Sequence, residues 1–312
     1  MLDPQLQPMF DRLAREFPQP PETLAPQEIR RIMDSMVQSL PPRPADTAVS
    51  DVLVPVQSHQ VPVRIYRPKA IVGPAPALIY FHGGGWMWGS IDSHDQVCLK
   101  IAQDAGVVVI NVGYRLAPEH AFPAQVDDSI GVLRWVAQEA IALDIDPHRI
   151  AIGGDSAGAN LATVAALIAK REGAPAVSFQ LLFYPGIDTA FDLPSFEENR
   201  DAPVLSTAMS KWIWRQYLGP YFGSQDDRAV PMHAADLAGM PPAMILVANH
   251  DPLRDEGVLY AQKLIREGVS VELRSAARLP HGYVRAFAMS SDVRDELDAA
   301  CASLRRALRV KS

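Results

Sequence analysis

The sequence predicts an α/β fold in which a mostly parallel β-sheet is flanked by helices on both faces. Its 312 residues are enough for one large α/β domain with a substantial core. From about residue 51, short β-branched runs alternate with amphipathic segments of helical periodicity. The runs are continuously apolar, which is typical of strands that are buried on both faces of a parallel sheet.

The N-terminal segment, residues 1–48, differs in character from the rest of the chain. The stretches 5–17 and 26–40 each place their apolar side chains on one face of a predicted helix. The proline-rich stretch PPRPAD (41–46) then breaks the helical pattern. We therefore expect a helical cap segment over residues 1–48 and the main domain over residues 49–312.

Eight strands are predicted in the main domain. They are VLVPV (52–56), VPVRIY (61–66), ALIYF (77–81), VVVINVGY (107–114), IAIGG (150–154), FQLLFY (179–184), MILVAN (244–249) and VSVEL (269–273). The first two or three have no predicted helix between them and are expected to be antiparallel. Segments such as 127–140 and 257–268 supply helices between later strands.

One interval interrupts the alternation of strands and helices. Residues 186–240 contain no clear strand but include the aromatic-rich helical stretch TAMSKWIWRQYLGPYF (207–222). An insertion over about 188–230, together with the N-terminal segment, predicts a helical cap above the carboxyl ends of the strands. Open α/β sheets bind their ligands at that edge.

Charge and composition argue against several classes of partner. The net charge is −7 and no large basic block stands out, so we expect no nucleic-acid partner. Cys98 and Cys301 lie far apart without metal-ligand spacing, which predicts buried free thiols and no metal site. No apolar run reaches the ~18–20 residues of a membrane span. No signal peptide is visible, so the expected location is cytoplasmic.

The stretch IAIGGDSAGANLATVAALIA (150–169) carries the predicted nucleophile, Ser156. Its GDSAG (154–158) fits the pattern G-x-S-x-G between an apolar strand and a long helix rich in alanine and leucine. At so sharp a turn a Cβ two residues before or after the serine would clash, and glycine stands at both positions. The helix that follows directs its first amides at developing negative charge.

A serine nucleophile needs a base, and the base needs a carboxylate that orients it. In enzymes with such a turn, the acid and then the histidine follow the serine along the chain. Asp251 and His281 each follow a predicted strand, which places both at the same sheet edge as Ser156. Asp255 and Glu256 are rivals for the acid, but residues that open a helix commonly serve as dipole partners.

Three glycines follow the predicted strand 77–81, in HGGGW (82–86). Consecutive glycines raise the entropy of the unfolded chain and pack no side chain, so a group must approach the main chain closely. A phosphate loop would need a following Lys and Ser/Thr, or G-x-G-x-x-G, but a Trp-Met-Trp run follows here. We therefore predict an oxyanion hole formed by the amides of Gly83, Gly84 and Ala157.

The other histidines are not expected to act as the base. His82 belongs to the glycine motif and is expected to anchor that loop. The remaining ones are expected in a hairpin or in polar loops, with solvated or supporting roles: His59, His94, His120, His148, His233 and His250.

Taken together, the motifs resemble those of the hormone-sensitive-lipase-like family of α/β-hydrolase esterases. They are, in chain order, HGGGW (82–86), YRLAPEHAFPA (114–124), GDSAG (154–158), DPLRDEG (251–257) and HGY (281–283). The resemblance covers about residues 50–290. It implies an α/β-hydrolase fold with an eight-stranded sheet and a helical cap, and hydrolysis of short- to medium-chain carboxylic esters. It further implies that no cofactor is used and that homodimers can form.

By position, the resemblance implies a role for each motif residue. Ser156 corresponds to the nucleophile, Asp251 to the orienting acid and His281 to the base. Gly83, Gly84 and Ala157 correspond to the oxyanion donors. Within YRLAPEH, Arg115 and Glu119 are expected to pair behind the site.

Substrate contacts are expected from two tryptophans and from the cap: Trp86, Trp88, Leu205, Met209, Trp212 and Tyr217. Packing of the cap onto the core is an equal alternative for these side chains. Two other functions stay open. One is an acyl hydrolase that acts on amides or bulky lipids. The other is a non-catalytic small-molecule receptor like the plant gibberellin receptors, which resemble this family but typically lose a triad member.

Overall fold

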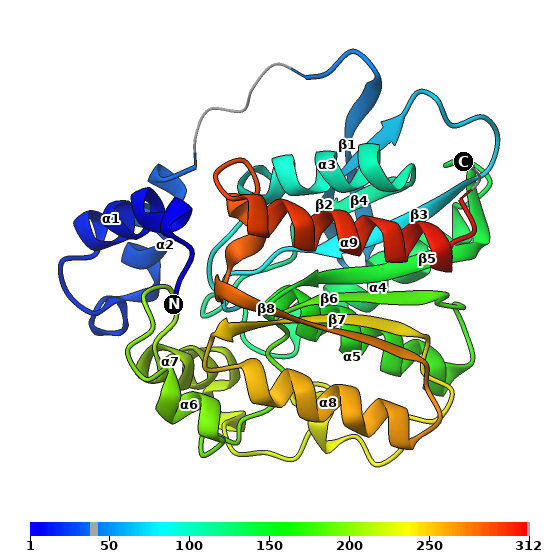
Figure 1. Cartoon of the computed structure of the whole chain (residues 1–312). Helices are drawn as coiled ribbons and strands as arrows, with labels where there is room; N and C mark the ends of the chain where they lie inside the picture. Colours follow the sequence, from blue (N-terminus) through cyan, green and yellow to red (C-terminus); the bar gives the residue numbers. More distant parts are fainter. Residues whose placement is uncertain (38–42, 311–312) are drawn as a thin grey trace.

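Eight strands form one sheet in the computed structural model, which describes residues 1–37 and 43–310 (Figure 1). The order across the sheet is β1-β2-β4-β3-β5-β6-β7-β8. The strands are β1 (Thr47–Val56), β2 (His59–Pro68), β3 (Ala75–Phe81), β4 (Val108–Val112), β5 (Ile145–Asp155), β6 (Phe179–Phe183), β7 (Ala243–His250) and β8 (Val271–Pro280). Each one overlaps a predicted run, so the expected mostly parallel, eight-stranded α/β sheet is confirmed.

Strand direction differs from the prediction at one point. β2 runs antiparallel to both of its neighbours, β1 and β4, as expected for the first runs. The third run, β3, was a candidate for the antiparallel group, and that part of the prediction is wrong. It pairs in parallel with β4 and β5. The helix α3 (Asp95–Ala105) connects β3 to β4 and supplies the crossover that a parallel pair needs.

Helices cover both faces of the sheet, with α3 and α9 on one face and α4, α5 and α8 on the other (Figure 1). The helices besides α3 are α1 (Gln7–Glu16), α2 (Pro26–Ser35), α4 (Ala124–Gln138), α5 (Ala157–Glu172), α6 (Pro194–Glu198), α7 (Thr207–Leu218), α8 (Arg254–Arg266) and α9 (Ser291–Ala307). The predicted helix 26–40 and the proline-rich stretch 41–46 fall partly on residues 38–42, outside the described residues.

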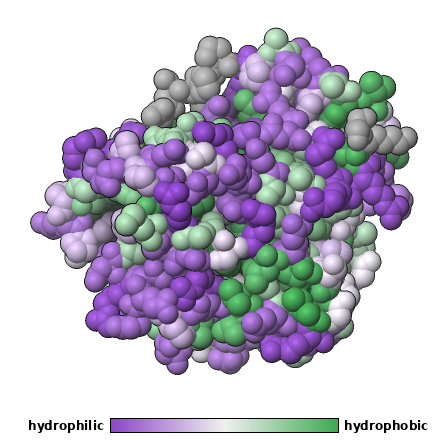
Figure 2. Space-filling view, in the orientation of Figure 1, coloured by the Kyte–Doolittle hydropathy of each residue, from purple (hydrophilic) through white to green (hydrophobic). Residues whose placement is uncertain are grey.

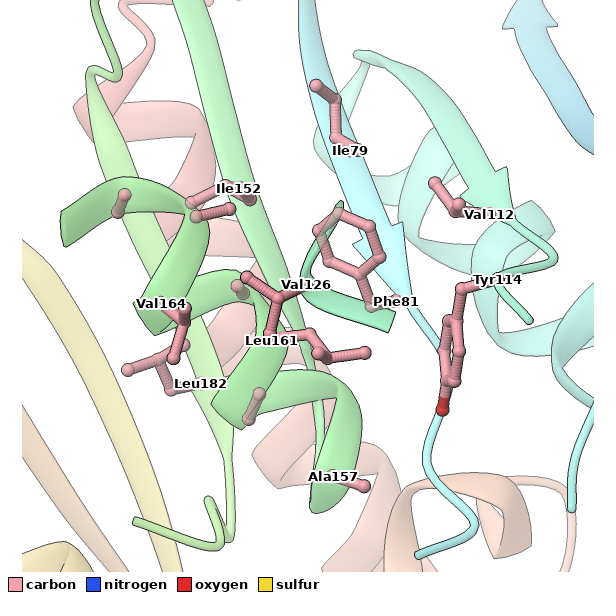
Figure 3. Close-up of a cluster of buried hydrophobic side chains, with 14 of the residues drawn as sticks. Ile79, Phe81, Val112, Tyr114, Val126, Ile152, Ala157, Leu161, Val164 and Leu182 are labelled. Carbon is pink, nitrogen blue, oxygen red and sulfur yellow. The ribbon is translucent and has the colours of Figure 1, made fainter. Parts of the chain in front are cut away.

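The core consists of two clusters of buried side chains, one on each face of the sheet. Successive residues of a strand point to opposite faces, so Ile79 of β3 joins the cluster under α4 and α5 while Leu78 joins the other. Figure 3 shows part of the first cluster, in which Val164 of α5 lies beside Leu182 of β6. Burying one such aliphatic side chain contributes roughly 1.5–3 kcal/mol.

The N-terminal helices lie beside α6 and α7 at one end of the molecule (Figure 1). Arg30 of α2 fastens them there. Its guanidinium donates to the carbonyl oxygens of Met87 (2.7 Å) and Ala117 (2.9 Å) and pairs with Glu119 at 2.8 Å. The expected Arg115–Glu119 pair is therefore wrong.

Arg115 has its own partner on α4. Its guanidinium lies 2.7 Å from the buried carboxylate of Asp128, and its main-chain N–H donates to the same carboxylate at 2.8 Å. A salt bridge supported by a main-chain hydrogen bond therefore holds the loop between β4 and α4 against α4.

Two predictions from composition can be compared directly with the structure. Cys98 and Cys301 are buried free thiols, as expected. Burial raises the pKa of Cys98 well above its usual value and that of Cys301 to about 12. Among the described residues, none of the helices combines the length and apolar character that crossing a membrane requires.

The two-cluster core predicts the effect of removing one of its side chains. Replacing Ile79, which is 0% exposed, with Ala should lower the free energy of unfolding by about 2–5 kcal/mol, because it removes buried contacts and leaves a cavity. The matched control is Ile141→Ala, at a position 94% exposed, which should change it by less than about 0.5 kcal/mol. Urea unfolding followed by circular dichroism measures both, and equal losses would contradict this account of the core.

Candidate active site

Ser156 lies at the turn between β5 and α5 in a strained main-chain conformation. Its φ of 55° and ψ of −119° place it outside the ordinary regions for a residue with a side chain, at a cost of order 1–3 kcal/mol. A Cβ on Gly154 or on Gly158 would overlap the carbonyl oxygen of Phe81 at the end of β3. The two flanking glycines therefore let the turn pack against β3, as expected from the sequence.

The three polar residues predicted to act together form a continuous hydrogen-bonded chain. Ser156 Oγ lies 2.9 Å from His281 Nε2, and His281 Nδ1 lies 2.7 Å from Asp251 Oδ2. The other oxygen of Asp251 accepts the main-chain N–H of Leu253 at 2.9 Å. Asp251 is completely buried and Ser156 is partly exposed. With a proton on Nδ1 directed at Asp251, Nε2 is left to accept the serine proton.

The strand ends bring these residues together. Ser156 follows β5, Asp251 follows β7 and His281 follows β8 directly, so all three lie at the carboxyl edge of the sheet. β8 extends to Pro280, seven residues beyond the predicted strand. The rival acids bond to other groups: Asp255 accepts the main-chain N–H of Ser195 at 2.8 Å, and Glu256 accepts that of Ile187 at 2.7 Å.

In the glycine loop, the pair of amides that lack an acceptor among the described residues is not the pair that the sequence predicts. The N–H of Gly83 donates to Asp155 Oδ1 at 2.9 Å, so this amide is already occupied and its expected role as an oxyanion donor is wrong. The amides of Gly84 and Gly85 have no acceptor within the described part of the chain. Gly84 has a φ of +125°, and a Cβ there would overlap the carbonyl oxygen of Trp88. Ala157, the first residue of α5, stands as predicted directly after Ser156.

The Asp155 carboxylate lies beneath this loop, buried and ionised. Burial alone would raise its pKa, but His94 nearby and hydrogen bonds from Tyr80 and Gly83 lower the pKa to about 2. Tyr80 Oη donates to Asp155 Oδ1 at 2.9 Å, and His94 Nε2 lies 3.2 Å from the same oxygen. His94, expected in polar loop surroundings, is in fact almost fully buried.

His82 contacts the same loop from another side. Its Nδ1 lies 2.8 Å from the carbonyl oxygen of Gly83, and its ring stacks on Tyr114 with 4.3 Å between centroids. Burial lowers the pKa of His82 to about 3, so the ring is neutral at neutral pH. A neutral, stacked ring fits the expectation that this histidine anchors the loop.

The side chains expected to contact substrate are mostly buried. Trp86 stacks on Tyr217 of α7, with 4.0 Å between ring centroids, and tilts against Trp214 at 4.6 Å. Trp88, Leu205 and Met209 are also buried, while Trp212 is partly exposed. Trp86 therefore packs against α7, which lies in the predicted cap insertion.

The chain around α6 is bonded to the segment that carries Asp251. Ser195 Oγ donates to the carbonyl oxygen of Pro252 at 2.6 Å, and Asn199 Nδ2 donates to that of Asp251 at 3.3 Å. The sequence gave no sign of these contacts, because they join residues 52 or more positions apart. They place one part of the predicted cap insertion directly against the acid.

Glu256 is a buried carboxyl group beside the site. Its Oε1 accepts the main-chain N–H of Ile187 in the loop after β6, and its Oε2 has no partner among the described residues. Burial raises the pKa of Glu256 well above its usual value. The group is therefore a neutral acid that holds this loop. No cluster of three or more His, Cys, Asp or Glu suited to a metal ion occurs within residues 1–37 and 43–310.

Comparisons with known proteins agree on one family. The family described as the alpha/beta hydrolase fold matches residues 78–285. The carboxylesterase NlhH of Mycobacterium tuberculosis is 43% identical over 252 residues, which cover 80% of this chain and 79% of that protein. An ethyl acetate hydrolase of Pseudomonas putida is 42% identical over 233 residues, covering 73% and 72%. A thermostable esterase from Pseudomonas putida ECU1011 has a similar structure, with a TM-score of 0.92 at 29% identity over 99% of this chain and 98% of that one.

The neutral Glu256 predicts a pH dependence of stability. Because its pKa is raised in the folded state, the folded protein keeps this proton at a pH where the unfolded chain has lost it. The free energy of unfolding therefore loses a contribution as the pH rises above about 4.5, the ordinary pKa of glutamate. Glu256→Gln removes this titration, so the stability of the variant relative to wild type should rise between pH 5 and pH 8. Urea unfolding at both values measures it, and a pH-independent difference would contradict a protonated Glu256.

Proposed function

Because the chain belongs to the hormone-sensitive-lipase-like branch of the α/β-hydrolase family and is a carboxylic-ester hydrolase, we propose that it cleaves short- to medium-chain acyl esters through an acyl-enzyme on Ser156. The observation that carries this proposal is the hydrogen-bonded chain from Asp251 through His281 to Ser156. One relative is named for the hydrolysis of ethyl acetate, an ester with a two-carbon acyl group, which supports a small acyl group here.

The mechanism follows from this chain of hydrogen bonds. His281 Nε2 takes the hydroxyl proton as Ser156 Oγ attacks the ester carbonyl, and Asp251 stabilises the imidazolium that forms. His281 then gives the proton to the departing alcohol. Water attacks the acyl-enzyme next, with His281 again as the base, and the acid is released.

The oxyanion of each tetrahedral intermediate needs donors that are free and already oriented. We assign this role to the amides of Gly84, Gly85 and Ala157. Gly83 acts differently: its N–H donates to Asp155, which fixes the start of the loop that carries the next two amides. Asp155 is thus a positioning residue.

The cap assignment is part of the same proposal. We assign residues 1–48 and about 188–230 to a cap over the catalytic domain 49–312. The contacts of Arg30 with the main chain of Met87 and Ala117 support it, as does the stacking of Tyr217 on Trp86. The cytoplasmic location and the homodimer stay predictions from the sequence and the family resemblance.

Replacing Ser156 with Ala tests the nucleophile. Hydrolysis of p-nitrophenyl esters from acetate to palmitate should peak at short or medium chains in the wild type, and kcat should fall by about 10⁶ in the variant. Ser178→Ala, at a serine that precedes β6 at the opposite sheet edge, is the matched control and should keep full activity. If Ser156→Ala retained substantial turnover, the triad would be wrong. A peak on palmitate would instead favour the alternative hydrolase of bulky lipids.

Replacing Asp155 tests the oxyanion loop. Asp155→Ala removes the acceptor for Gly83, so kcat should fall by about 10–10², less than the 10²–10³ lost with a whole oxyanion donor, and KM should change little. Asp155→Asn keeps an acceptor oxygen and should restore part of kcat. The control Asp236→Ala removes an exposed carboxylate that accepts a main-chain N–H far from the site. A loss expressed in KM alone would rule out this positioning role.

A further inference from the structure

Gly186, in the loop after β6, is a glycine that the fold itself does not require. The described residues include all nineteen glycines. Each of the others has either a positive φ or an atom within 3.1 Å of the place where a Cβ would stand. Gly186 has neither: the nearest atoms to such a Cβ are Leu253 Cδ1 at 3.8 Å and Trp86 Cη2 at 4.0 Å. An alanine would therefore fit without strain and would reduce the entropy of the unfolded chain.

The space beside Gly186 lies among the segments that carry the catalytic groups. The N–H of Gly186 donates to the carbonyl oxygen of Ser156 at 3.4 Å. Leu253 comes two residues after Asp251, and Trp86 directly follows the glycine loop. A side chain at position 186 would consequently lie between Leu253 of the acid segment and Trp86 after the glycine loop, while the main chain at this position contacts that of Ser156.

The main chain at this point is held firmly, so the space does not arise from a loose loop. Asn160 Nδ2 donates to the carbonyl oxygen of Gly186 at 2.9 Å and to that of Ala229 at 2.9 Å. The next amide, that of Ile187, donates to the buried Glu256. Gly186 is itself buried. The space where a side chain would stand therefore lies beside a main chain that is fixed by hydrogen bonds.

We propose that Gly186 is a specificity-determining position, where the absent side chain leaves room for an apolar arm of the bound ester. The atoms that face this space are carbons of Leu253 and Trp86, which suit an alkyl or aryl group and offer nothing to a charged one. The proposal rests on Ser156 being the nucleophile. It explains why the chain keeps a glycine where an alanine would stabilise the fold: the substrate fills the place of the side chain.

The test compares Gly186→Ala and Gly186→Val with wild type on two series of esters. One series lengthens the acyl group of p-nitrophenyl esters from acetate to octanoate, and the other enlarges the alcohol of acetate esters from ethyl to butyl and benzyl. In one series the ratio of kcat/KM for the larger ester to the smallest should fall by about 10–200-fold. The valine variant should fall further than the alanine variant. The series that responds identifies the arm of the ester that Gly186 accommodates.

Leu253→Ala gives the reciprocal test, because it enlarges the same space from the other side. It should shift the ratio in the responding series toward larger groups. Leu273→Ala, at an exposed leucine on β8, is its matched control and should leave the ratio unchanged. A purely structural role for Gly186 would lower all rates together and would give no opposite shift.

Stability separates the outcomes further. Gly186→Ala should melt at or above the wild-type temperature, since the residue fits its backbone and fills space. If this folded variant keeps both ratios within twofold of wild type, the proposal is overturned, whatever the valine variant does. That result would leave the proposed function intact as long as Ser156→Ala is inactive. Conversely, activity in Ser156→Ala would overturn the proposed function regardless of the ratios.

Discussion

The buried carboxylate of Asp155 joins the nucleophile turn to the glycine loop, and the geometry of the site depends on that link. A buried charge is stable only when it is paired and hydrogen-bonded. Here Tyr80 and Gly83 donate hydrogen bonds to the carboxylate, and His94 Nε2 lies 3.2 Å from it. Because Asp155 directly precedes Ser156, any movement of the loop would strain the turn as well. The two halves of the proposed site, the turn at Ser156 and the glycine loop, are thus linked by one side chain.

Two buried carboxyl groups near this site differ in the direction in which their pKa is shifted. Asp155 is ionised because it has hydrogen-bond donors and a histidine around it, whereas Glu256, equally buried, accepts main-chain amides on one oxygen and is left without a partner on the other. Hydrogen bonding and nearby charge, not burial alone, decide which carboxyl group keeps its proton. Both residues lie within family motifs of the sequence, and the sequence does not indicate which of the two carboxyl groups is ionised.

Much of the architecture could be predicted because its causes are local. Apolar β-branched runs become strands, and side chains that follow parallel strands meet at one edge. For this reason the sequence alone places Ser156, Asp251 and His281 close together, as the structure has them. The errors have non-local causes. The N–H of Gly83 donates to the buried carboxylate of Asp155, 72 residues further along the chain, and Glu119 pairs with Arg30, which lies 89 residues away along the chain. Trp86 packs on α7, which belongs to the insertion after β6. The hydrophobic periodicity of the sequence does not indicate where this insertion packs.

The order of the strands also bears on how the active protein arises. Ser156 follows a central strand, whereas His281 follows β8, at the edge of the sheet and 125 residues further along the chain. As the chain emerges from the ribosome, the nucleophile is made well before its base. On the proposed mechanism, a chain in which β8 has not yet joined the sheet lacks its base, and its serine hydroxyl has ordinary reactivity.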